Sequence, residues 1–140
     1  MKPSPMFKIA LFSAGIVALL AACSPAAGDP LKGTSWSLVD LNGTPAMKGM
    51  TVTAAFADGR VSGSGGCNSY GGAYEVNSDK LQIKEIVSTL MACADSEAMD
   101  QEAAFFSALG NAQKFRLTGG LLQILTSDGK TLTFAVGVAK

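Results

Sequence analysis

The chain has 140 residues, which is the size of one ordinary domain. Its 11 basic and 11 acidic residues balance, so it lacks the basic surplus with which nucleic-acid-binding proteins hold phosphates. It contains no histidine, which removes the commonest metal ligand and the usual proton shuttle near neutral pH, and we expect no metal ion and no cofactor.

The first segment in chain order is a predicted export signal, residues 1–22. Lys2 and Lys8 flank the start of an uncharged apolar run, residues 9–20, that is too short to cross a bilayer, which takes roughly 20 residues. A buried helix of the domain is the alternative. The Leu-Ala-Ala-Cys sequence that ends at Cys23 resembles the lipobox of bacterial lipoproteins. The resemblance implies that Cys23 is acylated and becomes the mature N-terminus.

Acylation would anchor the mature chain at the membrane. Two or three acyl chains hold a protein far more firmly than one, since each buried CH₂ adds about 0.8 kcal/mol. Ser24, in place of the aspartate that retains enteric lipoproteins at the inner membrane, favours the outer membrane, with the domain facing the periplasm. Residues 23–32, rich in proline and glycine, predict a flexible tether, and residues 33–140 the domain.

Alternating apolar and polar residues, separated by turn signals such as Asn-Gly and Asp-Gly, predict β-strands throughout the domain. Trp36 and Leu38 share one strand face, and Val52 and Phe56 share another. The predicted strands are residues 34–41, 51–57, 60–63, 73–76, 81–86, 114–118, 121–126 and 130–136.

One helix is predicted between the fifth and sixth of these strands. Asp95 or Ser96 can cap its N-terminus, and Gly110 with Asn111 can end it. Apolar residues at helical spacing predict the buried face, namely Met99, Ala103, Phe106 and Leu109. The expected fold class is α+β, mostly β: a curved or barrel-like antiparallel sheet with one packed helix.

Two cysteines remain once Cys23 carries lipid. Because the envelope outside the cytoplasmic membrane is oxidising, Cys67 and Cys93 are expected to form a disulfide, with two buried free thiols as the alternative. Catalysis by either thiol is disfavoured without a histidine to activate it, and two thiols alone make a poor zinc site.

The glycine-rich stretch before Tyr70 lacks the Gly-Lys-Ser/Thr of a nucleotide-binding loop and does not open a helix. Glycines there favour a tight bend or bulge instead. Asn68 and Tyr70 can then lie at the surface or cap backbone groups. Together with Met91 they form the candidate surface for a ligand or partner.

The stretch GSGGCNSYGG, residues 63–72, resembles the glycine-rich motif of the META domain family of HslJ-type, heat-inducible lipoproteins. STLMAC, residues 88–93, resembles the family's second motif, with Leu90 where arginine or lysine is commoner. The sequence GTSWSL from residue 33, and the helix with Glu102 and Phe105, fit the same pattern. The resemblance implies a small β-rich fold with one helix, and an association with stress or drug tolerance. The missing positive charge puts in doubt any binding role that it serves in relatives.

No carboxylate pair or Ser/Lys spacing indicates a catalytic site, so we expect no enzyme. The favoured function is a non-catalytic envelope module that binds an envelope protein, a peptide or a hydrophobic compound, and no nucleic acid. An exposed apolar patch near Met47, Met50 or Met91 would favour this reading. The alternatives are a structural role in envelope stability and a protease-inhibitor-like module.

Overall fold

The computed structural model describes residues 28–137 of the chain. The predicted signal and Cys23 lie outside these residues. The described part holds nine strands and one helix, and that helix is not long and apolar enough to cross a membrane. In chain order the elements are β1 (Thr34–Leu41), β2 (Thr44–Pro45), β3 (Thr53–Ala57), β4 (Arg60–Ser64), β5 (Ser69–Asn77), β6 (Lys80–Ser88), α1 (Ser96–Gly110), β7 (Ala112–Thr118), β8 (Leu121–Thr126) and β9 (Thr131–Val136).

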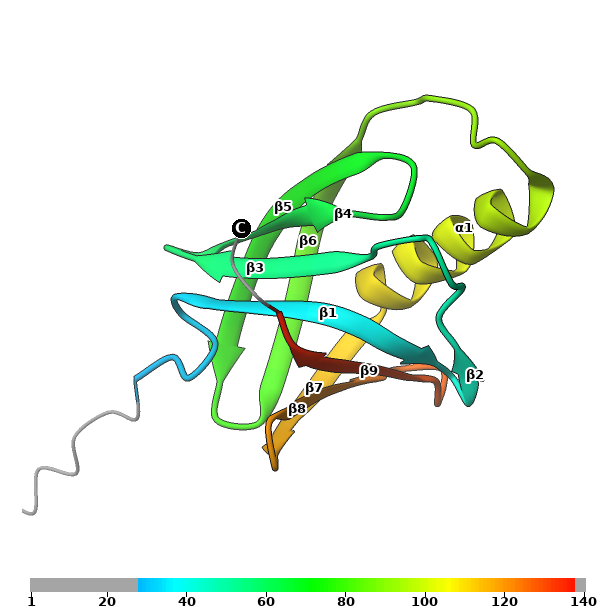
Figure 1. Ribbon diagram of the computed structural model, residues 1–140. Coiled ribbons are helices and arrows are strands. Elements are labelled where there is room, and N and C mark those ends of the chain that lie inside the picture. Colours follow the sequence, from blue (N-terminus) through cyan, green and yellow to red (C-terminus); the bar gives the residue numbers. More distant parts are fainter. Residues whose placement is uncertain (1–27, 138–140) are drawn as a thin grey trace, which may run out of the picture.

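The strands form a closed antiparallel barrel (Figure 1). From β3 onward each strand pairs with the next, and β9 returns to pair with β1, which closes a barrel of eight strands. β2 adds a two-residue extension beside the end of β1. The predicted mostly-β fold with a barrel-like sheet and one helix is confirmed.

Two turns that the sequence predicts are present with the expected backbone conformation. Asn42 and Gly43 have φ of 53° and 85°, and Asp58 and Gly59 have φ of 48° and 75°. Positive φ at both central residues is the mark of the type I′ turn, whose twist matches that of the flanking strands.

The inward side chains of the strands fill the barrel. Trp36, Leu38, Val52 and Phe56 are all buried, as their alternation predicted. Burial of each such side chain contributes about 1.5–3 kcal/mol to folding.

The predicted strand 73–76 is too short, because β5 begins at Ser69 and includes the end of the glycine-rich stretch.

Helix α1 packs against β6, β8 and β9. Asp95 is its N-cap, and the carboxylate accepts a hydrogen bond from the backbone N–H of Ala98 at 2.7 Å. The predicted buried face is wrong at Met99 and Ala103, which are both exposed, since the face that enters the core consists of Glu102, Phe105, Ala108 and Leu109. Hydropathy cannot place this face because one of its members is a carboxylate.

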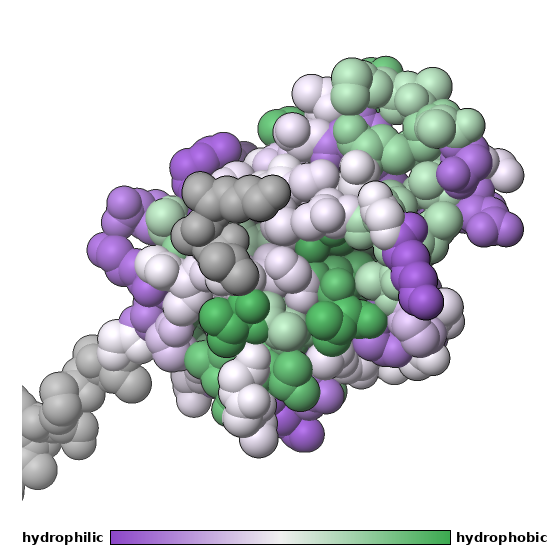
Figure 2. Space-filling model, viewed as in Figure 1, coloured by the Kyte–Doolittle hydropathy of each residue, from purple (hydrophilic) through white to green (hydrophobic). Residues whose placement is uncertain are grey.

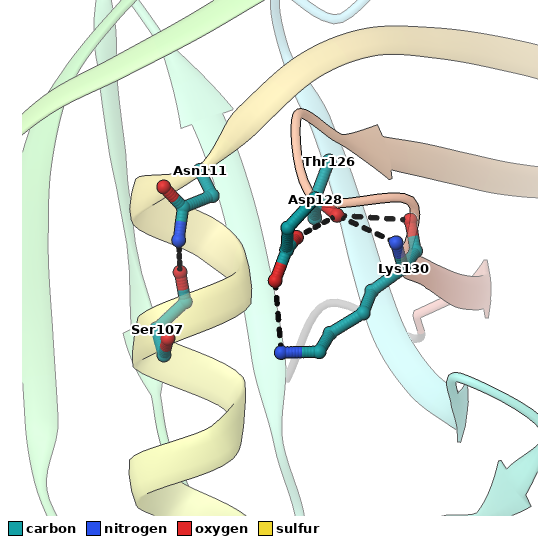
Figure 3. Close-up of polar contacts among 5 residues, drawn as sticks. All are labelled: Ser107, Asn111, Thr126, Asp128 and Lys130. Atoms are coloured by element: carbon teal, nitrogen blue, oxygen red, sulfur yellow. Dashed lines mark hydrogen bonds and ion pairs between the residues drawn. The ribbon is translucent and has the colours of Figure 1, made fainter.

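The C-terminal end of α1 lies beside the turn between β8 and β9 (Figure 3), and a main-chain hydrogen bond connects the two. The side-chain amide of Asn111 donates to the carbonyl of Ser107 at 2.9 Å, and the main-chain carbonyl of Asn111 accepts from the N–H of Ser127 at 2.9 Å. In that turn the Thr126 hydroxyl accepts from the N–H of Lys130 at 2.8 Å.

The predicted tether is wrong over its last residues. Leu31 is fully buried, and its N–H donates to the Asp29 carboxylate at 2.9 Å. Asp29 also accepts a hydrogen bond from the Tyr74 hydroxyl, and the N–H of Gly33 donates to Phe56 at 2.7 Å. The packed domain therefore begins near residue 29, because Leu31, although it lies in a polar segment, is buried in the core.

Candidate binding surface around the Cys67–Cys93 disulfide

A disulfide joins the glycine-rich loop between β4 and β5 to the loop between β6 and α1. Cys67 and Cys93 are 26 residues apart in sequence, and their Cα atoms are 5.5 Å apart, within the range that a disulfide needs. The predicted bridge is present, and the free-thiol alternative is not what the structure holds. The bridge brings both motifs of the sequence to one place in the fold.

Asn68 connects the same two loops through its side chain. Its oxygen accepts from the N–H of Met91 at 2.7 Å and from the Thr89 hydroxyl at 2.8 Å. Its amide nitrogen donates to the Met91 carbonyl at 3.1 Å and to Glu102 at 2.7 Å. The side chain is buried, with 5% of the residue exposed, so its predicted place on a ligand surface is wrong. The alternative, a residue that caps backbone groups, is correct.

Glu102 ties the helix to these loops. One carboxylate oxygen accepts from the backbone N–H of Asn68 at 2.6 Å and of Cys67 at 3.2 Å, and the other accepts from the Asn68 amide. The residue is 6% exposed, and none of the ion pairs found within residues 28–137 involves it. Three N–H donors thus offset the cost of burying a carboxylate.

Sequence reasoning did not single out Glu102 as a site residue. A signal was present, because Glu102 lies three positions before Phe105 and seven before Leu109, on a face that is otherwise apolar. An acidic residue in the buried stripe of a helix indicates that donors face it.

Two glycines allow close packing here, Gly65 in the loop and Gly63 near the end of β4. A Cβ on Gly65 would lie 2.5 Å from the Phe106 ring and 2.7 Å from Glu102, and a Cβ on Gly63 would lie 2.2 Å from the Thr53 carbonyl. No side chain fits at either position without displacing its neighbours. The predicted tight bend lies at residues 66–68, where Gly66 has φ of 118°.

Tyr70 is also buried, so its predicted exposure is wrong. It belongs to β5 and points inward, where its ring packs edge-on against Phe105 and Phe106 with centroids 5.5 and 5.4 Å away. Its hydroxyl donates to the Thr53 carbonyl at 2.8 Å. Burial raises the pKa of Tyr70 well above that of free tyrosine.

Met91 is the one predicted surface residue of the three that is exposed. It lies among apolar side chains on the loop between β6 and α1 and on the helix, where Figure 2 shows hydrophobic groups gathered at the upper right. We call this set the apolar surface; its members are Leu90 (96% exposed), Met91 (63%) and Met99 (50%).

Hollows lie on both sides of the disulfide. One, of about 440 Å³, runs between the loop and the helix and is lined by Met91, Met99, Ala103 and Phe106. The other, of about 400 Å³, lies between Met91 and the segment with Met47 and Met50. The apolar patch expected near Met47, Met50 or Met91 is found at Met91, whereas Met47 and Met50 are half-buried.

The donor atoms of Cys67, Cys93 and Glu102 lie within 4.8 Å of one another. Such a group suggests a metal site, but both sulfurs are joined in the disulfide, while thiolate is the form that binds metals. The carboxylate accepts three hydrogen bonds already. In the bridged protein this cluster is a structural brace.

Solved structures share the fold. A protein from Burkholderia xenovorans is 25% identical, with a TM-score of 0.68 over 98% of this chain and 99% of that chain. A second NMR structure is 24% identical, with a TM-score of 0.63, covering 76% of this chain and 91% of that one. A DUF4847 family protein from Bacteroides vulgatus is 18% identical, with a TM-score of 0.55, covering 79% and 97%. No curated protein matches the chain significantly.

The family model of the META domain matches residues 29–138. Its first matched residue, Asp29, is also the first residue of the packed domain by its hydrogen bonds. Both motifs that resembled this family lie inside the match, joined by the disulfide and by Asn68. The chain is therefore a member of the META domain family.

Proposed function

We propose that this protein is a non-catalytic binding module of the bacterial envelope. Acyl chains on Cys23 hold it at the outer membrane, and the apolar surface contacts an envelope partner in the periplasm. The observation that carries the proposal is the exposure of Leu90, at 96%, in a loop that the fold holds by covalent and polar bonds. A soluble domain gains nothing from a clustered apolar surface unless something covers it.

The loop is braced in a way that suits binding. The disulfide fixes Cys93, and Asn68 bonds both the N–H and the carbonyl of Met91. A loop that is ordered before it meets its partner loses less conformational entropy on binding, so its apolar contacts contribute more to affinity. Rigidity and exposure therefore occur in the same loop.

The polar groups beside the apolar surface support binding over catalysis. The Asn68 side chain makes four hydrogen bonds, the Glu102 carboxylate accepts three, and both cysteines are oxidised. A general base or nucleophile needs a free lone pair within reach of substrate. These groups are committed to holding the loop.

Site-specific photo-crosslinking in intact cells tests the proposal. A photoreactive residue at position 90 is expected to give one dominant crosslinked band, whereas the same residue at Thr118, an exposed position at the end of β7, gives none. In the Cys23→Ala background the chain should leave the membrane fraction and the band should weaken. Equal labelling from both positions, or normal membrane fractionation of Cys23→Ala, would count against the proposal.

A further inference from the structure

Strand β6 parts from β7 near its start. The two share a single residue pair, Lys80 with Lys114, while β6 pairs with β5 from one end to the other. α1 connects them in the chain: β6 leads into the loop before the helix, and β7 begins where the helix ends (Figure 1). Beyond residue 82, one edge of β6 therefore has no strand beside it.

The register shows which main-chain groups lie on that edge. Thr89 donates its N–H to Ser69, at the start of β5, and main-chain groups alternate in direction along a strand, so those of Ser88 point away from β5. The N–H of Tyr74 donates to Gly59, so the main-chain groups of Tyr74 point toward β4. The main-chain groups of Ile83, its partner on β6, therefore also point toward the open edge.

A bulge separates these two positions. The register shifts between the pair Gly71–Val87 and the pair Ala73–Lys84, and this shift leaves one extra residue on β6. Glu85 lies in this bulge with φ of 54°. Bulges increase the bend and twist of a strand, which accounts for the divergence from β7.

Outside the strand ladders, no main-chain hydrogen bond found within residues 28–137 reaches Ile83 or Ser88. Instead, a groove of about 480 Å³ lies between this edge and the helix, with Ile83, Ile86 and Ser88 on one side and Phe106 and Gly110 on the other. Ser88 and Phe106 also line the hollow beside Met91, so the groove continues into the apolar surface.

We propose that this groove binds an extended segment of a partner polypeptide, which adds to β6 as a further strand. This inference rests on the proposed function and names the chemical class of the partner. Main-chain donors and acceptors on a strand edge are satisfied by another main chain, and a hydrophobic compound or acyl chain would leave them unpaired.

The walls of the groove define the segment. In an added strand every second side chain points toward the helix, where Phe106 and Ile86 favour an apolar residue. Glu85 and the largely buried Glu102 are the charged residues that line the two hollows, which favours a basic residue in the segment near Glu85. The partner segment therefore alternates apolar with polar residues and carries positive charge.

Hydrogen exchange on the full-length chain in lipid nanodiscs tests strand addition. The probe is a pool of heptapeptides with valine, leucine, isoleucine or phenylalanine at alternate positions, threonine between them and lysine at each end. The amides of Ile83 and Ser88 are expected to exchange at least tenfold more slowly with the pool present. The same pool with alternate backbone nitrogens methylated keeps the side chains, loses donors and should give no protection.

Variants of Ser88 provide a matched pair. Ser88→Pro removes the edge N–H without touching the β5 ladder and should abolish the protection at Ile83, while Ser88→Ala keeps the N–H and should behave as wild type. Equal protection by the methylated pool, or none by either pool, overturns strand addition. Protection that rises with protein concentration alone would make a second copy the occupant and also overturns it. The crosslink from position 90 is independent of these results, so the proposed function can stand when this inference fails.

Discussion

Replacement of Glu102 by glutamine is expected to lower the free energy of unfolding by about 3 kcal/mol. The carboxylate accepts from the N–H groups of Cys67 and Asn68 and from the Asn68 amide, so its oxygens meet only donors. In glutamine an NH₂ group replaces one carboxylate oxygen, so this donor faces the N–H donors of the loop. Each buried polar group left unpaired lowers the free energy of unfolding by about 1–3 kcal/mol. Chemical denaturation of the variant and wild type measures the difference.

Asp100→Asn is the control, since it neutralises an exposed carboxylate two residues earlier on the same helix. Surface changes of this kind usually shift stability by no more than about 0.5 kcal/mol. Equal, small losses in both variants would show that Glu102 does not hold the loops. Faster hydrogen exchange confined to residues 88–93 in Glu102→Gln would show directly that the loop loses its support.

Loss of the disulfide is the second large effect. A closed loop of about 27 residues constrains the unfolded chain by roughly 3.5 kcal/mol in the chain-entropy model. For a domain of this size that loss corresponds to a fall in melting temperature on the order of 15 °C. Cys67→Ser and Cys93→Ser should each show it in a thermal melt.

Reduction supplies the control for that experiment. Wild-type protein in a thiol reductant should have the same melting temperature as the serine variants. The reductant should not change the melting temperature of the variants. Melting temperatures that stay the same in both variants would contradict a stabilising bridge. A fall in only one variant would point to packing around that cysteine rather than to the bond.

The sequence predicted those parts of the fold that depend on neighbouring residues. Asp58-Gly59 and Asn42-Gly43 formed the expected turns because their backbone preferences are local. The strand faces followed from alternation for the same reason. The helix face did not, because the inward place of Glu102 depends on donors from a loop 34 residues away. Leu31 in the supposed tether shows the same dependence on distant packing.

The sequence likewise predicted only part of the candidate site. The disulfide was predicted from cysteine number and compartment, and Met91, which was named as part of the candidate surface, is exposed. For Asn68 and Tyr70 the sequence left two possibilities open, a position on the candidate surface and the capping of backbone groups. The structure buries both. Gly65 lets the loop approach the helix, where Asn68 bonds Glu102, while Tyr70 points inward from β5 and donates to the Thr53 carbonyl.

Footprinting by hydroxyl radicals tests most directly whether the apolar surface is the contact. Met91 and Met99 are exposed in the isolated domain, and so is Leu121 at the start of β8, which serves as the control. Mass spectrometry compares oxidation of these residues in intact envelopes and in purified protein. We expect several-fold slower oxidation of both methionines in envelopes, with Leu121 unchanged. Equal oxidation of Met91 in the two preparations would contradict the proposal that a partner covers this surface.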